Sequence, residues 1–122
     1  MGEFQTRYNV LLKQIDNLPR TDRKVDETNR NRLKENVVAL VKIQDQIDRM
    51  SSGDEQKEEI DELQIQLNKE YLSIITLGNS YRPLWQRFQT RKSGFANDFR
   101  KASIEAVKLV ETLKRKLRDL RR

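Results

Sequence analysis

Apolar residues recur along this chain at intervals of three and four, which is the spacing of one face of an α-helix. The first such stripe runs from about Glu3 to Leu18 and ends before Pro19. Its members are Phe4, Tyr8, Leu11, Ile15 and Leu18. This pattern predicts an amphipathic helix whose apolar side faces a shared core.

A polar stretch, Arg20 to Asn31, separates the first stripe from a second that is clearest from Leu33 to Met50. The second stripe consists of Leu33, Val37, Leu40, Val41, Ile43 and Ile47. Asp26 and Thr28 are candidate N-caps, because their side-chain oxygens can accept hydrogen bonds from the free N–H groups at a helix start. We therefore expect the second helix to begin near these two residues.

The third stripe follows Ser51–Asp54, whose small and polar residues indicate a turn. Ser52 and Glu55 have the spacing of a capping box that opens a helix. The stripe itself consists of Ile60, Leu63, Leu67, Tyr71, Ile74 and Leu77. We expect this helix to end at Gly78, because glycine tolerates the left-handed conformation that often terminates a helix.

The last segment begins with Pro83, a residue favoured at the first position of a helix, and Trp85 and Phe88 follow it. Beyond Ser93-Gly94 comes the longest stripe, which is close to a heptad repeat. Its members are Phe95, Phe99, Ala102, Ala106, Leu109, Leu113, Leu117 and Leu120. Together the stripes predict an all-α fold, an up-and-down bundle of three to four antiparallel helices with a long C-terminal helix, kinked or straight.

The last helix has two possible arrangements. If the third and last helices form a tight hairpin about Gly78–Pro83, an unbroken last helix projects past the bundle, and residues 108–122 overhang by about 20 Å. Its leucines would then face water and require a partner helix or a second copy of the chain. If the helix breaks at Ser93-Gly94, a final helix that begins near Phe95 buries the same leucines within the chain.

Charge is distributed unevenly along the sequence. The net charge is +6, but residues 1–81 contain 12 Lys/Arg and 15 Asp/Glu, whereas residues 82–122 contain 13 and 4. Many of these cations share one side of the last helix, and we define Lys101, Lys108, Arg115, Arg118 and Arg122 as the basic face. Such a row can follow a phosphate backbone or an anionic membrane. Alternatively, it keeps the helix solvated or pairs with the acidic start of the third helix.

The sequence contains no His and no Cys. Their absence excludes disulfides, thiolate nucleophiles, imidazole acid–base catalysis and the usual zinc sites. No glycine-rich phosphate loop or nucleophile elbow is present either. We therefore predict no enzymatic activity, with no catalytic residue, metal, cofactor or small-molecule substrate.

No apolar run approaches the roughly 20 residues of a membrane-spanning helix, and the lack of cysteine fits a cytoplasmic chain. The length suits one domain covering residues 1–122. Gly2–Phe4 contains Glu-Phe, which a common cloning site encodes, so we expect that the chain is a fragment of a longer protein.

The first functional hypothesis is a non-enzymatic protein–protein interaction module: a scaffold, adaptor or assembly domain that binds another protein or a second copy of itself. Its candidate contacts are Trp85 and Phe88, together with the leucine seam, which we define as Leu109, Leu113, Leu117 and Leu120. The alternative hypothesis is electrostatic binding of a nucleic acid or an anionic membrane through the basic face.

Overall fold

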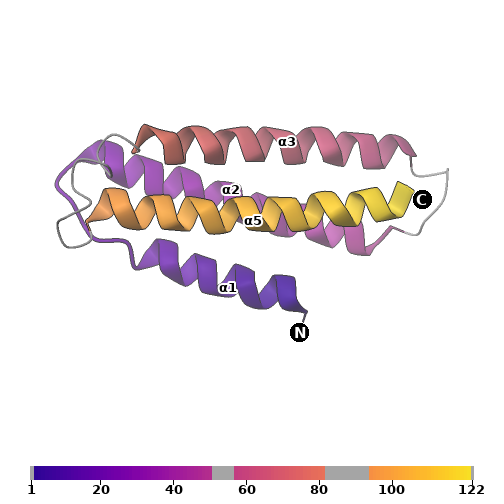
Figure 1. Cartoon of the computed structure of the whole chain (residues 1–122), viewed down its shortest axis with the longest axis horizontal. Coiled ribbons are helices and arrows are strands. Elements are labelled where there is room, and N and C mark those ends of the chain that lie inside the picture. Colours follow the sequence, from indigo (N-terminus) through magenta and orange to yellow (C-terminus); the bar gives the residue numbers. More distant parts are fainter. Residues whose placement is uncertain (1, 51–56, 82–93, 122) are drawn as a thin grey trace.

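The computed structural model describes residues 2–50, 57–81 and 94–121, and within them it contains four α-helices and no strand. The helices are α1 (Glu3–Asp16), α2 (Lys24–Asp48), α3 (Lys57–Ser80) and α5 (Phe95–Arg121). Consecutive helices run in opposite directions along a common axis (Figure 1). The prediction of an all-α helical bundle is therefore confirmed.

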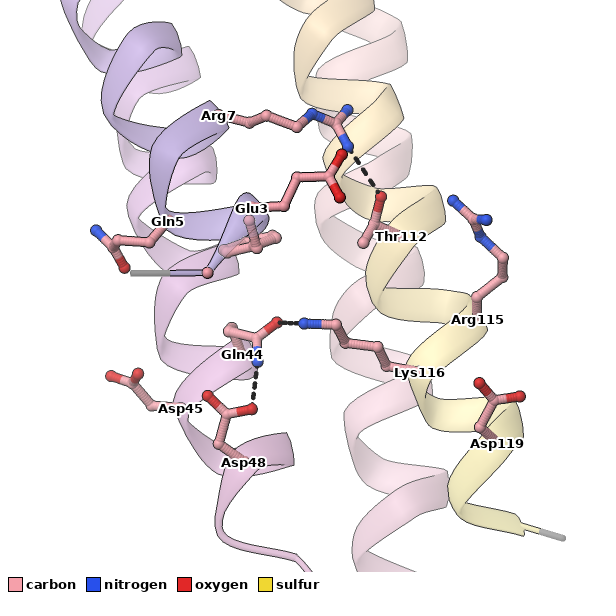
Figure 2. Close-up of a pocket in the computed structure, with 12 residues that line it drawn as sticks. Glu3, Gln5, Arg7, Gln44, Asp45, Asp48, Thr112, Arg115, Lys116 and Asp119 are labelled. Atoms are coloured by element: carbon pink, nitrogen blue, oxygen red, sulfur yellow. Dashed lines mark hydrogen bonds between the residues drawn. The ribbon is translucent and has the colours of Figure 1, made fainter.

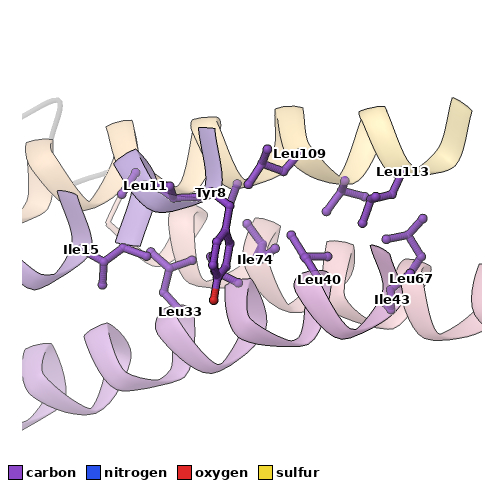
Figure 3. Packing of buried hydrophobic residues seen from close by; sticks show 14 of the residues in the cluster. Tyr8, Leu11, Ile15, Leu33, Leu40, Ile43, Leu67, Ile74, Leu109 and Leu113 are labelled. Atoms are coloured by element: carbon purple, nitrogen blue, oxygen red, sulfur yellow. The ribbon is translucent and has the colours of Figure 1, made fainter. Parts of the chain in front are cut away.

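All three other helices pack against α5, and α3 does so most extensively. The apolar stripe of α5 is buried from Phe95 to Leu117 and meets the stripes of α1, α2 and α3 in one core (Figure 3). Full burial of one leucine side chain contributes about 1.5–3 kcal/mol to stability. These contacts are sufficient to hold α5 firmly within the bundle.

The leucine seam is part of this core. Leu109, Leu113 and Leu117 have exposed fractions of 1%, 0% and 0%, and Leu120 packs half-buried against the same cluster. The helix begins at Phe95, directly after Gly94, as in the second of the two expected arrangements. The overhang of the first arrangement is therefore absent, because the other helices of the same chain cover the apolar side of α5.

The last helix does not project past the bundle, because the register between α3 and α5 differs from that of a tight hairpin. Gly78 lies beside Ser103: a Cβ on Gly78 would approach Ser103 Oγ to 2.6 Å and Ser103 Cβ to 3.1 Å. Further along, Lys114 Nζ lies over the ring of Tyr71, 4.4 Å from its centroid. Lys114, in the second half of α5, therefore lies beside the middle of α3.

Two expected helix ends are also wrong. Gly78 does not terminate α3, which continues to Ser80 without a left-handed residue at the glycine; here glycine is needed because two helices approach closely. At the start of α2 the N-cap is Arg23, so Asp26 and Thr28 lie inside the helix. The capping box of Ser52 and Glu55, and Pro83, lie outside the described residues.

We predict that Gly78→Ala destabilises the protein by about 1 kcal/mol, because the added methyl group must displace Ser103 or separate the helices. This loss outweighs the gain in helix propensity, which is at most about 1 kcal/mol. In the Ser103→Gly background the same substitution meets no obstacle. Urea unfolding of the four proteins of this double-mutant cycle should yield a favourable coupling of about 1–2 kcal/mol, the difference between the loss in wild type and the unobstructed gain in propensity. A Gly78→Ala protein more stable than wild type would contradict the close approach.

Candidate functional site

The basic face lies on the side of α5 opposite its buried leucines. Lys101, Lys108, Arg115 and Arg118 are all exposed, whereas Arg122 lies outside the described residues. The same side also contains exposed Glu111 and Asp119. The resulting surface is a row of cations interrupted by two carboxylates.

Little of this positive charge is neutralised within the chain. Lys108 Nζ lies 3.2 Å from Glu105 Oε1 in the same helix. For Lys101, Arg115 and Arg118, the described part of the chain provides neither an ion pair nor a hydrogen bond. The expected alternative, pairing with the acidic start of α3, therefore has no support in the described contacts.

Other cations of α5 bind within the bundle. Arg100 Nη1 donates to the carbonyl oxygen of Gly78 at 3.3 Å, and Lys116 Nζ donates to Gln44 Oε1 at 2.7 Å. Lys114 lies over Tyr71. These three hold α5 to its neighbours, whereas the exposed side chains of Lys101, Arg115 and Arg118 make no such contact among the described residues.

A groove lies between α2 and α5 where α1 begins (Figure 2). We call it the α2–α5 groove, and its volume is about 710 Å³. The first residues of α1 close one end, and the two walls consist of Gln44, Asp45 and Asp48 on α2 and Thr112, Arg115, Lys116 and Asp119 on α5.

Hydrogen bonds between the helices cross this groove. Lys116 donates to Gln44, and Gln44 Nε2 in turn donates to Asp48 Oδ1 at 2.5 Å. Closer to α1, Arg7 Nη1 donates to Thr112 Oγ1 at 3.3 Å. The polar floor explains why Gln44 is nearly fully buried without leaving an amide atom unpaired.

A buried polar cluster lies at the opposite end of the bundle, beside the aromatic rings of Phe95 and Phe99. The Tyr81 hydroxyl donates to Asp26 Oδ1 at 2.7 Å and accepts from Asn29 Nδ2 at 2.9 Å. Thr21 Oγ1 donates to the other carboxylate oxygen of Asp26 at 2.8 Å. Burial, with an additional contribution from the Asp26 carboxylate, raises the pKa of Tyr81 to about 12. This cluster joins the end of α3 to the start of α2.

The predicted contact residues thus fall into three groups. The leucine seam is core, four members of the basic face are exposed, and Trp85 and Phe88 lie outside the described residues. The sequence pattern missed the α2–α5 groove and the Tyr81 cluster. A signal for the cluster was present: Tyr81 continues the apolar stripe of α3 at the i, i+7 spacing from Ile74, and a buried tyrosine requires a polar partner.

No protein-family model, no curated protein and no solved structure matches this chain. Among the described helices, none is both long enough and apolar enough to cross a membrane.

We predict that Tyr81→Phe destabilises the protein by about 1–2 kcal/mol near neutral pH, because the buried Asp26 carboxylate loses a donor. This difference should shrink at alkaline pH. A folded-state pKa near 12, above the unfolded value of 10.0, means that the hydroxyl stabilises the fold below pH 10 and loses this effect as pH rises towards 12. Urea unfolding at pH 8, 10 and 11 measures the difference; a constant value would contradict the assignment.

Proposed function

We propose that this chain is a non-enzymatic interaction module that binds the phosphate backbone of a nucleic acid through the basic face of α5. The observation that carries the proposal is the state of Lys101, Arg115 and Arg118, which are exposed and have no partner among the described residues. Lysine and arginine side chains in this state can replace the counterions that surround nucleic-acid phosphates.

A protein contact through the leucine seam is less well supported. Leu109, Leu113 and Leu117 already fill the core, and a partner could reach them only by separating α5 from the other helices. Opening the core in this way costs several kcal/mol, because each leucine would first lose its present contacts. The basic face requires no such rearrangement.

An anionic membrane is the other polyanion that a basic helix can bind. Helices that lie in a membrane interface insert a broad apolar side among the lipids. In α5 that side faces the core, and Ile104, 48% exposed, is the large apolar residue that accompanies the basic face. Contact with a nucleic-acid backbone depends on cations alone, so it fits this surface better.

The binding should be weak and independent of base sequence. Within the stripe of α5, Phe99 is buried in the core, so its ring is not available to stack on a base. Successive members of the seven-residue row are about 10.5 Å apart along the helix. Four phosphate contacts give dissociation constants on the order of 10⁻⁴–10⁻⁶ M at physiological salt.

We predict that neutralising Lys101, Lys108, Arg115 and Arg118 to Gln abolishes most binding to a fluorescein-labelled DNA duplex. A matched control replaces Arg32, Lys42, Arg49 and Lys69, four exposed cations on α2, its C-cap and α3, and so changes the net charge equally. Fluorescence anisotropy should show at least tenfold weaker binding for the first variant and less than twofold for the control. The wild-type affinity should fall with salt with a log–log slope of about −3 to −4.

Equal losses in the two variants would contradict the proposal, since they would mean that net charge alone governs binding. Vesicles containing 30% phosphatidylserine provide the second comparison. Wild-type binding to these vesicles at lower concentration than to DNA, with the same dependence on the basic face, would assign the surface to membranes instead.

A further inference from the structure

The charge of α5 changes sign along the helix. Residues 95–104 contain two cations and one carboxylate, which gives a net charge of +1. Residues 105–111 contain one cation and two carboxylates, a net charge of −1. Residues 112–121 contain five cations and one carboxylate, a net charge of +4. α5 is therefore positive towards both ends and negative in its middle.

The contacts of the middle segment preserve this pattern. Lys108 Nζ lies 3.2 Å from Glu105 Oε1, so its charge is partly offset. Glu111 is exposed on the same side as the basic face. Arg7 of α1 donates to Thr112, at the border with the C-terminal segment, and so adds its charge near the more positive end. A molecule that approaches the basic face therefore meets two positive regions with carboxylates between them.

The two positive regions are held at a fixed separation. α5 is one continuous helix from Phe95 to Arg121 and lies between α1 and α3, against α2 (Figure 1). At 1.5 Å per residue, Lys101 lies about 21 Å from Arg115 and about 25 Å from Arg118 along the helix axis. Because 14 residues are close to four turns, Lys101 and Arg115 also face nearly the same direction.

This pattern fits two separate rows of phosphates better than one continuous row. A single strand lying along α5 would have to pass the carboxylate of Glu111. In B-form DNA the two backbones border a major groove about 12 Å wide and a minor groove about 6 Å wide. Once the size of the phosphates is included, the two rows are roughly 18 Å apart across the major groove and roughly 12 Å apart across the minor groove. The separation of Lys101 from Arg115 matches the larger distance, because long side chains can lean inward by a few ångström.

We propose that α5 bridges the major groove of double-stranded DNA, with Lys101 at the phosphates of one strand and Arg115 and Arg118 at those of the other. Glu111 then lies over the open groove, where no phosphate repels it. This inference rests on the proposed function and names the form of nucleic acid that the basic face binds. Contacts to phosphates carry no base information, so the binding remains independent of sequence.

The test moves one cation of α5 without altering the net charge. Glu111→Arg combined with Arg118→Glu transfers a cation from one positive region into the middle, and both side chains are exposed. The probes are a fluorescein-labelled DNA duplex of mixed sequence and one of its strands alone. Fluorescence anisotropy should show at least fivefold weaker binding of this variant to the duplex. Binding to the single strand should change less than twofold, because a flexible strand can follow the moved cation.

The matched control is Glu35→Lys combined with Lys42→Glu, an exposed pair with the same spacing on α2, which should bind both DNAs as wild type does. Unchanged duplex binding by the α5 variant would overturn the inference and leave the proposed function intact. Equal losses on both DNAs, with the helical circular dichroism spectrum retained, would do the same, as would tighter wild-type binding to the single strand than to the duplex. Absence of wild-type binding to either DNA would refute the proposed function, and the inference with it.

Discussion

The burial of the leucine seam against α1, α2 and α3 is the interaction on which the other features of this bundle depend. α5 is in contact with every other helix, and its stripe is almost inaccessible to solvent from Phe95 to Leu117. The close approach of Gly78 to Ser103 sets the register at one end, where small residues replace leucines. With this register, the whole length of α5 lies beside other helices of the same chain.

Because the apolar side of α5 is buried in the core, its charged residues lie on its other sides, where they have two roles. Lys116 and Arg100 bind across to α2 and α3, whereas the basic face remains in solvent. α1 is shorter than α2 and α5, and the α2–α5 groove begins at its first turn, with Asp45 and Asp48 on one wall and Arg115, Lys116 and Asp119 on the other. The proposed nucleic-acid contact follows from how the seam positions α5.

The apolar periodicity predicted the helices well. A stripe at spacings of three and four is compatible with few structures other than a helix in a chain so poor in glycine and proline. The periodicity could not determine the register between α3 and α5. This register depends on the close approach of the two helices at Gly78, a residue that in sequence alone resembles a helix terminator. The periodicity also could not reveal the groove, because this depends on the length of α1 relative to α2 and α5. Periodicity was sufficient to predict that Lys101, Lys108, Arg115 and Arg118 are exposed. That Lys101, Arg115 and Arg118 have no partner among the described residues could be learned only from side-chain positions.

The central claim is that the leucine seam is the core of a single chain. Amide hydrogen exchange, measured together with sedimentation over a hundredfold range of concentration, tests it most directly. We expect a monomer throughout, with the amides of Leu109, Leu113 and Leu117 among the slowest to exchange at every concentration. Protection of these amides that appears only as a dimer forms would contradict it, since the seam would then be an interface between chains.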